Sequence, residues 1–163
     1  MRRKTFSRAE KKAYEISNRL NSVDFKVTPS MKRKVDDLAI WLSAGDKSKV
    51  RGATQTVIEL LCAAARVPAA RLSLVDRAPG EFRGDKLVVK LYGVCAPDGT
   101  ITMAYRTAVR RKVFAFKTYL NTMAHEFMHH YDHRRLQLGA SFHTRGFYQR
   151  VGDLVAQLVP AKA

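Results

Sequence analysis

The five histidines of this chain all lie in one short window, from His125 to His143. Two of them, His125 and His129, frame the string H-E-F-M-H, which fits the H-E-x-x-H pattern of zinc-binding helices. Because residues i and i+4 of a helix differ by only about 40° around its axis, both imidazoles point to the same side. Glu126 lies about 100° away from His125, where its carboxylate can reach a water beside the metal. The spacing therefore predicts a zinc site with a general base.

Two histidines leave a catalytic zinc site incomplete, because such a site usually takes three protein ligands and keeps one position open for water. No glutamate follows Glu126, so the downstream glutamate ligand of thermolysin-like proteases is missing. The longer pattern H-E-x-x-H-x-x-G-x-x-H also fails, since Asp132 and Arg135 occupy the positions of its glycine and third histidine. His143, beyond a glycine-containing turn that lets the chain fold back, is the remaining candidate among the histidines. Asp153 and Asp132 stay open as alternative ligands.

The other two histidines are expected at the surface of a polar helix end. His130 points about 100° away from His129 around the helix, and His133 lies about 12 Å along the axis from His125. Neither position suits a third ligand. Asp132, three residues after His129, is either a hydrogen-bond acceptor that orients a ligand imidazole or a solvated helix residue.

The string from His143 to Phe147 resembles the third-ligand segment of the SprT-like metalloproteases, a family that includes the Spartan-type DNA–protein crosslink proteases. That family follows its H-E-x-x-H helix with a third histidine in a short His-Gly-x-x-Phe-like string. Here His143 and Phe147 match, whereas Thr144 stands in place of the glycine. The order of the segments before the motif also fits the family, with a strand, then basic residues, then the residues that lead into His125. The resemblance covers roughly residues 50–160.

The resemblance implies a zinc-dependent peptide hydrolase that acts on a protein or peptide substrate. One Zn²⁺ ion would be held by His125, His129 and His143. Glu126 would take the proton of a zinc-activated water and later deliver it to the leaving amine.

Two further expectations concern the substrate. The strand at 101–105 is expected to be an edge strand that pairs with the extended backbone of a peptide. Three residues are candidates for stabilising the oxyanion: Tyr148, Tyr131 and Arg145.

The charge of the chain is the second strong signal. Thirty Lys and Arg against fourteen Asp and Glu give a net charge of +16, which indicates a polyanionic partner, with nucleic acid the first choice. A merely basic soluble protein is the alternative.

The densest basic cluster outside the N-terminus is Arg106, Arg110, Arg111, Lys112 and Lys117. We interpret it either as a phosphate-tracking surface beside the site or as a solvated helix entrance, and residues 2–4 and 32–34 would extend such a surface.

A second hypothesis is a basic nucleic-acid-binding or regulatory module whose zinc site is structural or vestigial. A structural site is closed by four protein ligands, with Asp132, Asp153 or another histidine as the fourth. Three protein ligands and a water would favour the enzyme instead.

The segments that must position these residues follow a helix, sheet, helix order. Ser7 and Glu10 form a capping box, and the hydrophobic period that follows is typical of helices. We expect N-terminal helices at about 7–20, 29–43 and 54–66. Alternating, β-branched segments then predict strands at 71–75, 86–94 and 100–105. The helical period returns from about residue 114 through the motif and, after a break at Gly139, at 145–158.

We therefore expect an α+β fold with a zincin-like core, in which a small mixed or antiparallel sheet packs on the H-E-x-x-H helix behind N-terminal helices. Residues 1–50 would form a basic helical extension packed on this core, and residues 51–163 the SprT-like zincin metalloprotease domain.

The cysteines and the hydropathy of the sequence indicate in which cellular compartment the protein is expected. Cys62 and Cys95 lack a C-x-x-C partner and are interpreted as reduced structural thiols of an intracellular protein. The basic start of the chain is not followed by the apolar segment of a secretion signal, and the longest apolar runs are far below the roughly 18 residues that span a membrane. We expect a cytoplasmic, DNA-associated monomer with no membrane partner.

Overall fold

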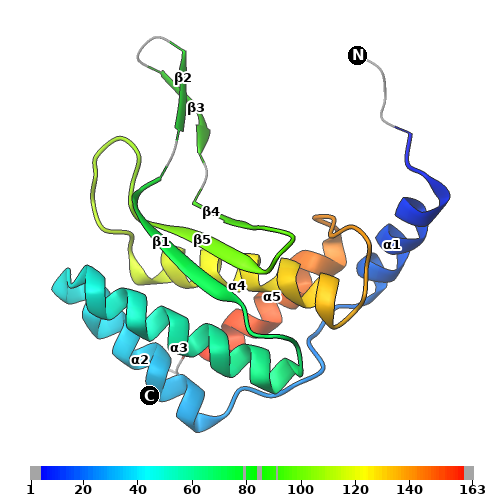
Figure 1. Ribbon diagram of the computed structural model, residues 1–163, viewed down its shortest axis with the longest axis horizontal. Helices are drawn as coiled ribbons and strands as arrows, with labels where there is room; N and C mark the ends of the chain where they lie inside the picture. The colour runs from blue at the N-terminus through cyan, green and yellow to red at the C-terminus, as the bar shows by residue number, and fades with distance from the viewer. Residues whose placement is uncertain (1–4, 79, 84–85, 91, 160–163) are drawn as a thin grey trace.

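The computed structural model describes residues 5–78, 80–83, 86–90 and 92–159. The described residues form an α+β fold of five helices and five strands (Figure 1). The helices are α1 (Arg8–Arg19), α2 (Pro29–Ala44), α3 (Lys47–Ala65), α4 (Phe116–Arg134) and α5 (Arg145–Leu158). The strands are β1 (Arg71–Arg77), β2 (Gly80–Arg83), β3 (Lys86–Lys90), β4 (Gly93–Cys95) and β5 (Thr100–Arg106).

The helix ends follow from local sequence signals. Ser7 and Glu10 form the expected capping box at the start of α1, and Thr28 caps α2 ahead of a proline in its first turn. Helix α3 begins at residue 47, earlier than the expected residue 54, because the side chain of Asp46 accepts a hydrogen bond from the backbone of Lys49. The first turns of α3 are mostly charged and polar, so the hydrophobic period alone did not reveal them.

Strand β5 lies in the middle of a three-stranded mixed sheet with the order β1-β5-β4. It pairs in parallel with β1, from Arg71 opposite Thr100 to Arg77 opposite Arg106, and antiparallel with β4. The expectation that residues 101–105 form an edge strand is therefore wrong. The alternation of residues predicts that a segment is a strand, but not which other strands pair with it. Here β1, which lies earlier in the chain, pairs with one side of β5 and β4 pairs with the other.

The expected strand at 86–94 is two separate strands. Strand β3 pairs with β2 in an antiparallel hairpin, whereas β4 forms the edge of the three-stranded sheet beside β5. Leu91, which the prediction placed inside one strand, lies outside the described residues.

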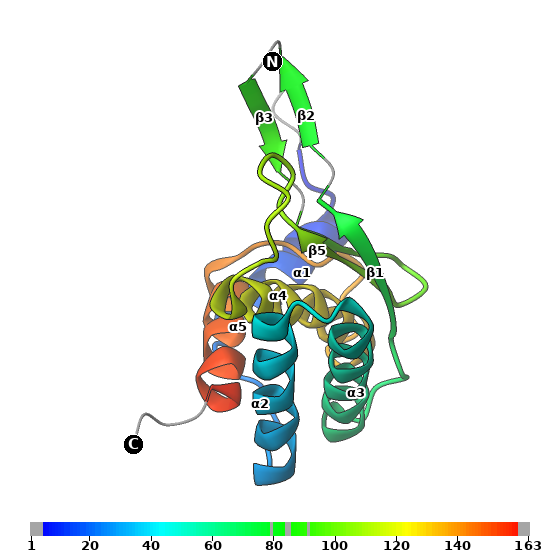
Figure 2. The same ribbon diagram turned by 90° about the vertical axis from the view of Figure 1, so that its left-hand side faces the viewer.

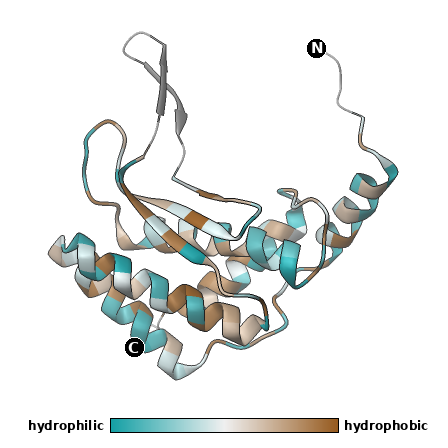
Figure 3. Ribbon diagram, viewed as in Figure 1, coloured by the Kyte–Doolittle hydropathy of each residue, from teal (hydrophilic) through white to brown (hydrophobic). Residues whose placement is uncertain are grey.

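The helices α2 to α5 pack on one side of the sheet, and the β2–β3 hairpin projects from the sheet on the other side (Figures 1 and 2). Hydrophobic residues concentrate along β1 and β5 and in the C-terminal half of α3 (Figure 3). A single cluster of buried side chains joins these elements. It includes the fully buried residues Leu38, Ile58, Ile101, Phe127 and Leu154.

Residues on both sides of position 50 contribute to this core. Phe25, before α2, packs its ring edge against Phe127 of α4, and Val35 and Leu38 of α2 are fully buried in the same cluster. The division into residues 1–50 and 51–163 remains a prediction. None of the described helices combines the length and apolarity needed to cross a membrane.

The burial pattern of the helices generates a first prediction. Ile58 of α3 is 0% exposed, whereas Ile40 of α2 is 58% exposed. The substitution Ile58→Ala should lower the free energy of unfolding by about 2–5 kcal/mol, because it leaves a cavity in the core. The matched change Ile40→Ala should alter it by less than about 0.5 kcal/mol. Urea denaturation measures both, and equal losses would contradict the described packing of α3.

Candidate metal centre

Three histidines from two segments converge on one point. His125 and His129 lie one turn apart on α4, and His143 lies in the loop before α5. Their Nε2 atoms are 3.3 Å apart for His125 and His129, 3.1 Å for His125 and His143, and 3.0 Å for His129 and His143. Tetrahedral zinc with Zn–N bonds of about 2.0–2.1 Å would separate its nitrogen ligands by about 3.3 Å. These three residues therefore lie close enough to hold one metal ion.

A directed chain of hydrogen bonds sets the tautomer of His129. The hydroxyl of Ser141 donates to Oδ2 of Asp132 at 2.8 Å, so its oxygen accepts from Nδ1–H of His129 at 2.7 Å. The other ring nitrogen, Nε2, therefore carries a lone pair that points toward the two neighbouring histidines. Metal-ligating histidines characteristically donate their second N–H in this way.

Asp132 is held in place by a buried ion pair with Arg150, and both side chains are 0% exposed. One guanidinium nitrogen of Arg150 donates to Oδ1 and Oδ2 of Asp132 at 3.0 and 3.2 Å. Burial raises the pKa of Asp132, and the Arg150 cation opposes that rise by stabilising the carboxylate. Of its two expected roles, Asp132 takes that of an orienting acceptor, and it acts on His129 through Ser141.

Burial keeps two of the three imidazoles neutral. It lowers the pKa of His125 to about 4, with His143 adding to the effect, and the pKa of His129 to about 3, with the neighbouring histidines adding to it. Both rings are therefore uncharged near pH 7, which is the form that binds a metal ion.

Glu126 projects from α4 toward β4 and is 6% exposed. Burial raises its pKa to about 7, and the backbone of Cys95 partly opposes that rise. The side chain lies so close to β4 that a Cβ added to Gly93 would be 3.0 Å from Cγ of Glu126. A carboxylate whose pKa is near neutrality can accept and return a proton with little free-energy cost.

An open cleft borders the three histidines. Its larger hollow, of about 550 Å³, is lined by residues that include Lys117, Asn121, Thr122 and Tyr148. A second hollow, of about 420 Å³, is lined by all three histidines and by residues that include Val94, Cys95, His133 and Ser141. Gly93, His125 and Glu126 line both hollows. Strand β4, the edge of the three-stranded sheet, thus forms one wall of the cleft.

Both cysteines are free thiols, Cys62 in the core and Cys95 half-buried in the cleft. Burial raises the pKa of both, that of Cys95 to about 11 with Glu126 adding to the rise. They are therefore protonated near pH 7, when a thiol is a poor nucleophile and metal ligand.

The structure separates the three candidates for oxyanion stabilisation. Tyr148 lines the larger hollow beside His125 and is 55% exposed. Tyr131 is buried and donates a hydrogen bond to Asp24 at 2.9 Å, so its hydroxyl is engaged elsewhere. Arg145, the first residue of α5, has an exposed side chain.

The surface placement expected for His130 is wrong. His130 is 2% exposed, and its Nε2–H donates to the carbonyl of Pro68 at 2.8 Å. The turn at Gly99 covers the other edge of the ring. The helix end that looked polar in the sequence therefore packs against the connection from α3 to β1. His133 is exposed, as expected.

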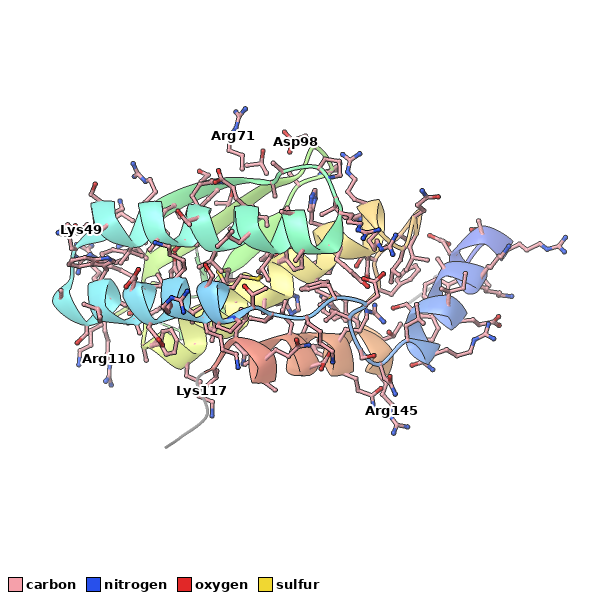
Figure 4. All side chains as sticks on the ribbon, turned by 90° about the horizontal axis from the view of Figure 1, so that it is seen from below. Lys49, Arg71, Asp98, Arg110, Lys117 and Arg145 are labelled. Carbon is pink, nitrogen blue, oxygen red and sulfur yellow. The ribbon has the colours of Figure 1, made fainter. Side chains whose placement is uncertain are left out.

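The predicted basic residues lie at the end of β5, in the connection between β5 and α4, and in the first turn of α4. Arg110, Arg111 and Lys112 are exposed there, whereas Arg106 forms an ion pair with Asp76 at 3.5 Å. Lys117, on the first turn of α4, lines the larger hollow of the cleft. Arg110, Lys117 and Arg145 project from the same long side of the molecule, opposite Arg71 and Asp98 (Figure 4). Residues 2–4, which would extend the basic surface, lie outside the described residues.

Sequence patterns missed the residues that support the ligands. Ser141 and Arg150 belong to no motif, and only the tertiary structure brings them to His129 and Asp132. Gly93 likewise gave no signal of its contact with Glu126. The placement of His143 beside the motif histidines was expected from the turn at Gly139.

No protein-family model, curated protein or solved structure matches this chain. The resemblance to SprT-like metalloproteases therefore stays a prediction, and the chemistry of the site has to be judged from its own residues.

The ligand geometry generates a second prediction. The wild-type protein should bind one zinc ion, and His143→Ala should weaken that binding by more than about 100-fold, because losing a direct ligand costs more than losing a supporting hydrogen bond. The control His133→Ala should leave the affinity unchanged, since His133 lies outside the group of three. Competition with a zinc chelator measures both. Equal affinities of the two variants would exclude His143 as a ligand.

Proposed function

We propose that this protein is a zinc-dependent metallopeptidase with a zincin-like core, similar to the SprT-like proteases. The observation that carries the proposal is the convergence of His125, His129 and His143 beside the buried carboxylate of Glu126 in an open cleft. Imidazole ligands with an adjacent carboxylate of pKa near 7 suit the hydrolysis of an amide by an activated water.

Each residue of the site has a role in this proposal. Zinc, when bound, lowers the pKa of a coordinated water to about 7 and polarises the carbonyl of a peptide. Glu126 accepts the proton of the attacking water and passes it to the leaving amine. Ser141 and Asp132 keep His129 in the tautomer that a ligand requires. Tyr148, in the cleft beside His125, is the best-placed side chain to donate a hydrogen bond to a developing oxyanion.

Strand β4 is our proposed binding edge for the substrate. It is the edge strand that faces the cleft, and Val94 in it is 52% exposed. An extended peptide can add to such an edge through backbone hydrogen bonds, which bind many sequences with similar affinity. This assigns to β4 the role that the sequence had suggested for residues 101–105.

The carboxylates considered as a fourth ligand have other partners. Asp132 is bound by Arg150 and Ser141, and Asp153 accepts hydrogen bonds from the backbone of Val23 at 3.0 Å and from Gln157 at 3.4 Å. Within the described part of the chain, only the three histidines form the group that could hold an ion, and three protein ligands favour a catalytic site over a structural one. The proposal therefore ranks the enzyme above the basic module with a structural or vestigial zinc site.

A third prediction tests the role of Glu126. The substitution Glu126→Gln should lower the rate of peptide cleavage by at least about 100-fold, because it removes the proton acceptor, while zinc binding is retained. Cleavage of a protein substrate and the zinc content are measured on the same sample. The matched control Glu59→Gln changes a carboxylate on α3 outside the cleft and should leave cleavage unaltered. Unchanged cleavage by Glu126→Gln would remove Glu126 from the mechanism.

We also propose that the enzyme works on or near nucleic acid. Two observations support this proposal. The net charge is +16, and Arg110, Arg111 and Lys112 are exposed. These three residues are close in the chain to Lys117, which lines one end of the cleft. Such a surface would hold a polyanion near the cleft and bring the site to proteins bound to it.

A fourth prediction tests this partner. Binding to double-stranded DNA should weaken steeply as salt rises, and replacing Arg110, Arg111 and Lys112 together with Gln should reduce the slope of log K against log salt by about 2–3. Fluorescence anisotropy at several salt concentrations measures the slope. The control neutralises Arg8, Lys11 and Lys12 on α1. A wild-type affinity that does not depend on salt would exclude phosphate contacts.

A further inference from the structure

Helix α1 contacts the loop that carries the third histidine. The loop before α5 lies against α1 (Figure 1). The hydroxyls of Ser17 and Thr144 are 2.8 Å apart and buried, and Thr144 directly follows His143. Thr144 also caps α5 by accepting from the backbone of Phe147 at 3.0 Å. The contact therefore holds the backbone next to a metal ligand.

The last turn of α1 approaches the first turn of α5 too closely for a side chain. A Cβ added to Gly146 would lie 2.1 Å from the carbonyl oxygen of Ser17 and 2.8 Å from those of Asn18 and Leu20. The absence of a side chain at Gly146 lets the two backbones meet. The carbonyl end of α1 thus faces the amide end of α5, an arrangement that both helix dipoles favour.

Arg150 connects this junction to the metal ligands. One of its nitrogens donates to the carbonyls of Ser17 and Leu20 at 2.7 and 2.6 Å, which satisfies groups that a helix end leaves unpaired. The other donates to Ser17 Oγ at 3.1 Å and to Asp132. From Asp132 the hydrogen bonds continue through Ser141 to Nδ1 of His129.

A third contact lies on the outer side of the loop. The ring of Phe142, the residue before His143, packs against Phe6 with centroids 5.0 Å apart and against Tyr14 with centroids 6.0 Å apart. Aromatic pairs at such distances attract each other beyond the area that they bury. Residues on both sides of His143 are therefore held by α1 or the residues before it.

We propose that α1 is a positioning element of the metal centre, with Ser17 as its hydrogen-bonding contact to Arg150 and Thr144 and Tyr14 as its contact to Phe142. Through Arg150, Asp132 and Ser141 it sets the orientation of His129, and through Thr144 and Phe142 it sets the position of His143. The inference rests on the proposed metal site but not on proteolysis. Because linkage is reciprocal, metal binding must in turn stabilise the docked state of α1.

A zinc-affinity measurement tests the proposal. Removing the hydroxyl in Ser17→Ala takes the acceptor from one N–H of Arg150 and the hydrogen-bond partner from the Thr144 hydroxyl. It should weaken zinc binding by about 3–10-fold, the scale of a net hydrogen-bond contribution. The matched control Thr54→Val removes a buried hydroxyl that bonds Tyr119 at 2.7 Å, away from the cleft. It should lower the melting temperature without changing the zinc affinity.

Two further measurements separate a positioning role from general destabilisation. Ser141→Ala should weaken zinc binding by about 10–100-fold, and Ser141→Thr, which keeps the hydroxyl, should restore it. In the wild-type protein, zinc should slow the hydrogen exchange of α1 amides more than that of α2 amides. The hydrogen-exchange measurement tests the role of α1 even if Ser17→Ala does not fold.

The outcomes are distinct. Wild-type zinc affinity in Ser17→Ala, or exchange in α1 that zinc does not slow, would overturn the role of α1. Failure of the wild-type protein to bind zinc would overturn both the metal site and this inference. Zinc binding with the expected variant effects, but without peptide cleavage, would overturn only the proposed protease activity and would support the inference.

Discussion

The buried ion pair between Arg150 and Asp132 is the interaction that the arrangement of the candidate site depends on. Neither side chain is exposed, and each charge would be costly to bury alone. Removing one partner of such a pair typically costs about 3–5 kcal/mol, because the other charge is left uncompensated. The second terminal nitrogen of Arg150 donates to the carbonyls of Ser17 and Leu20, and the hydroxyl of Ser141 donates to Asp132. Three segments that are distant in sequence, α1, α4 and α5, are thereby held in one relative position.

This constraint reaches His129 of the candidate metal site through the direction of the hydrogen bonds. A carboxylate only accepts, so the hydroxyl of Ser141 must donate to Asp132 and accept a hydrogen bond from Nδ1–H of His129. The lone pair of His129 is consequently aimed at the point where His125 and His143 also converge. Burial keeps His125 and His129 neutral and gives Glu126 a pKa of about 7 in the same small volume. The fold thus brings the three histidines and the proposed base together in the protonation states that the proposed chemistry needs.

The cleft joins this chemistry to the rest of the surface. Strand β4 forms one wall, and the contact between Gly93 and Glu126 brings the proposed base directly under the edge where a peptide could bind. At one end of the cleft, α4 begins with Lys117, directly after the basic connection from β5. Strand β4, the three histidines and Lys117 therefore border two adjacent hollows, an arrangement that suits the proposed protease acting near a polyanion.

The sequence by itself determined the features that depend on local geometry. Helical spacing placed His125, Glu126 and His129 on one helix, the capping box at Ser7 started α1, and the turn near Gly139 returned the chain so that the third histidine could approach. Only the tertiary structure decided that β5 is central, that His130 is buried, and that Ser141 and Arg150 support the site. These features depend on contacts between segments far apart in the chain. Periodicity describes which face of a segment is apolar, but it carries no information about which distant partner covers that face.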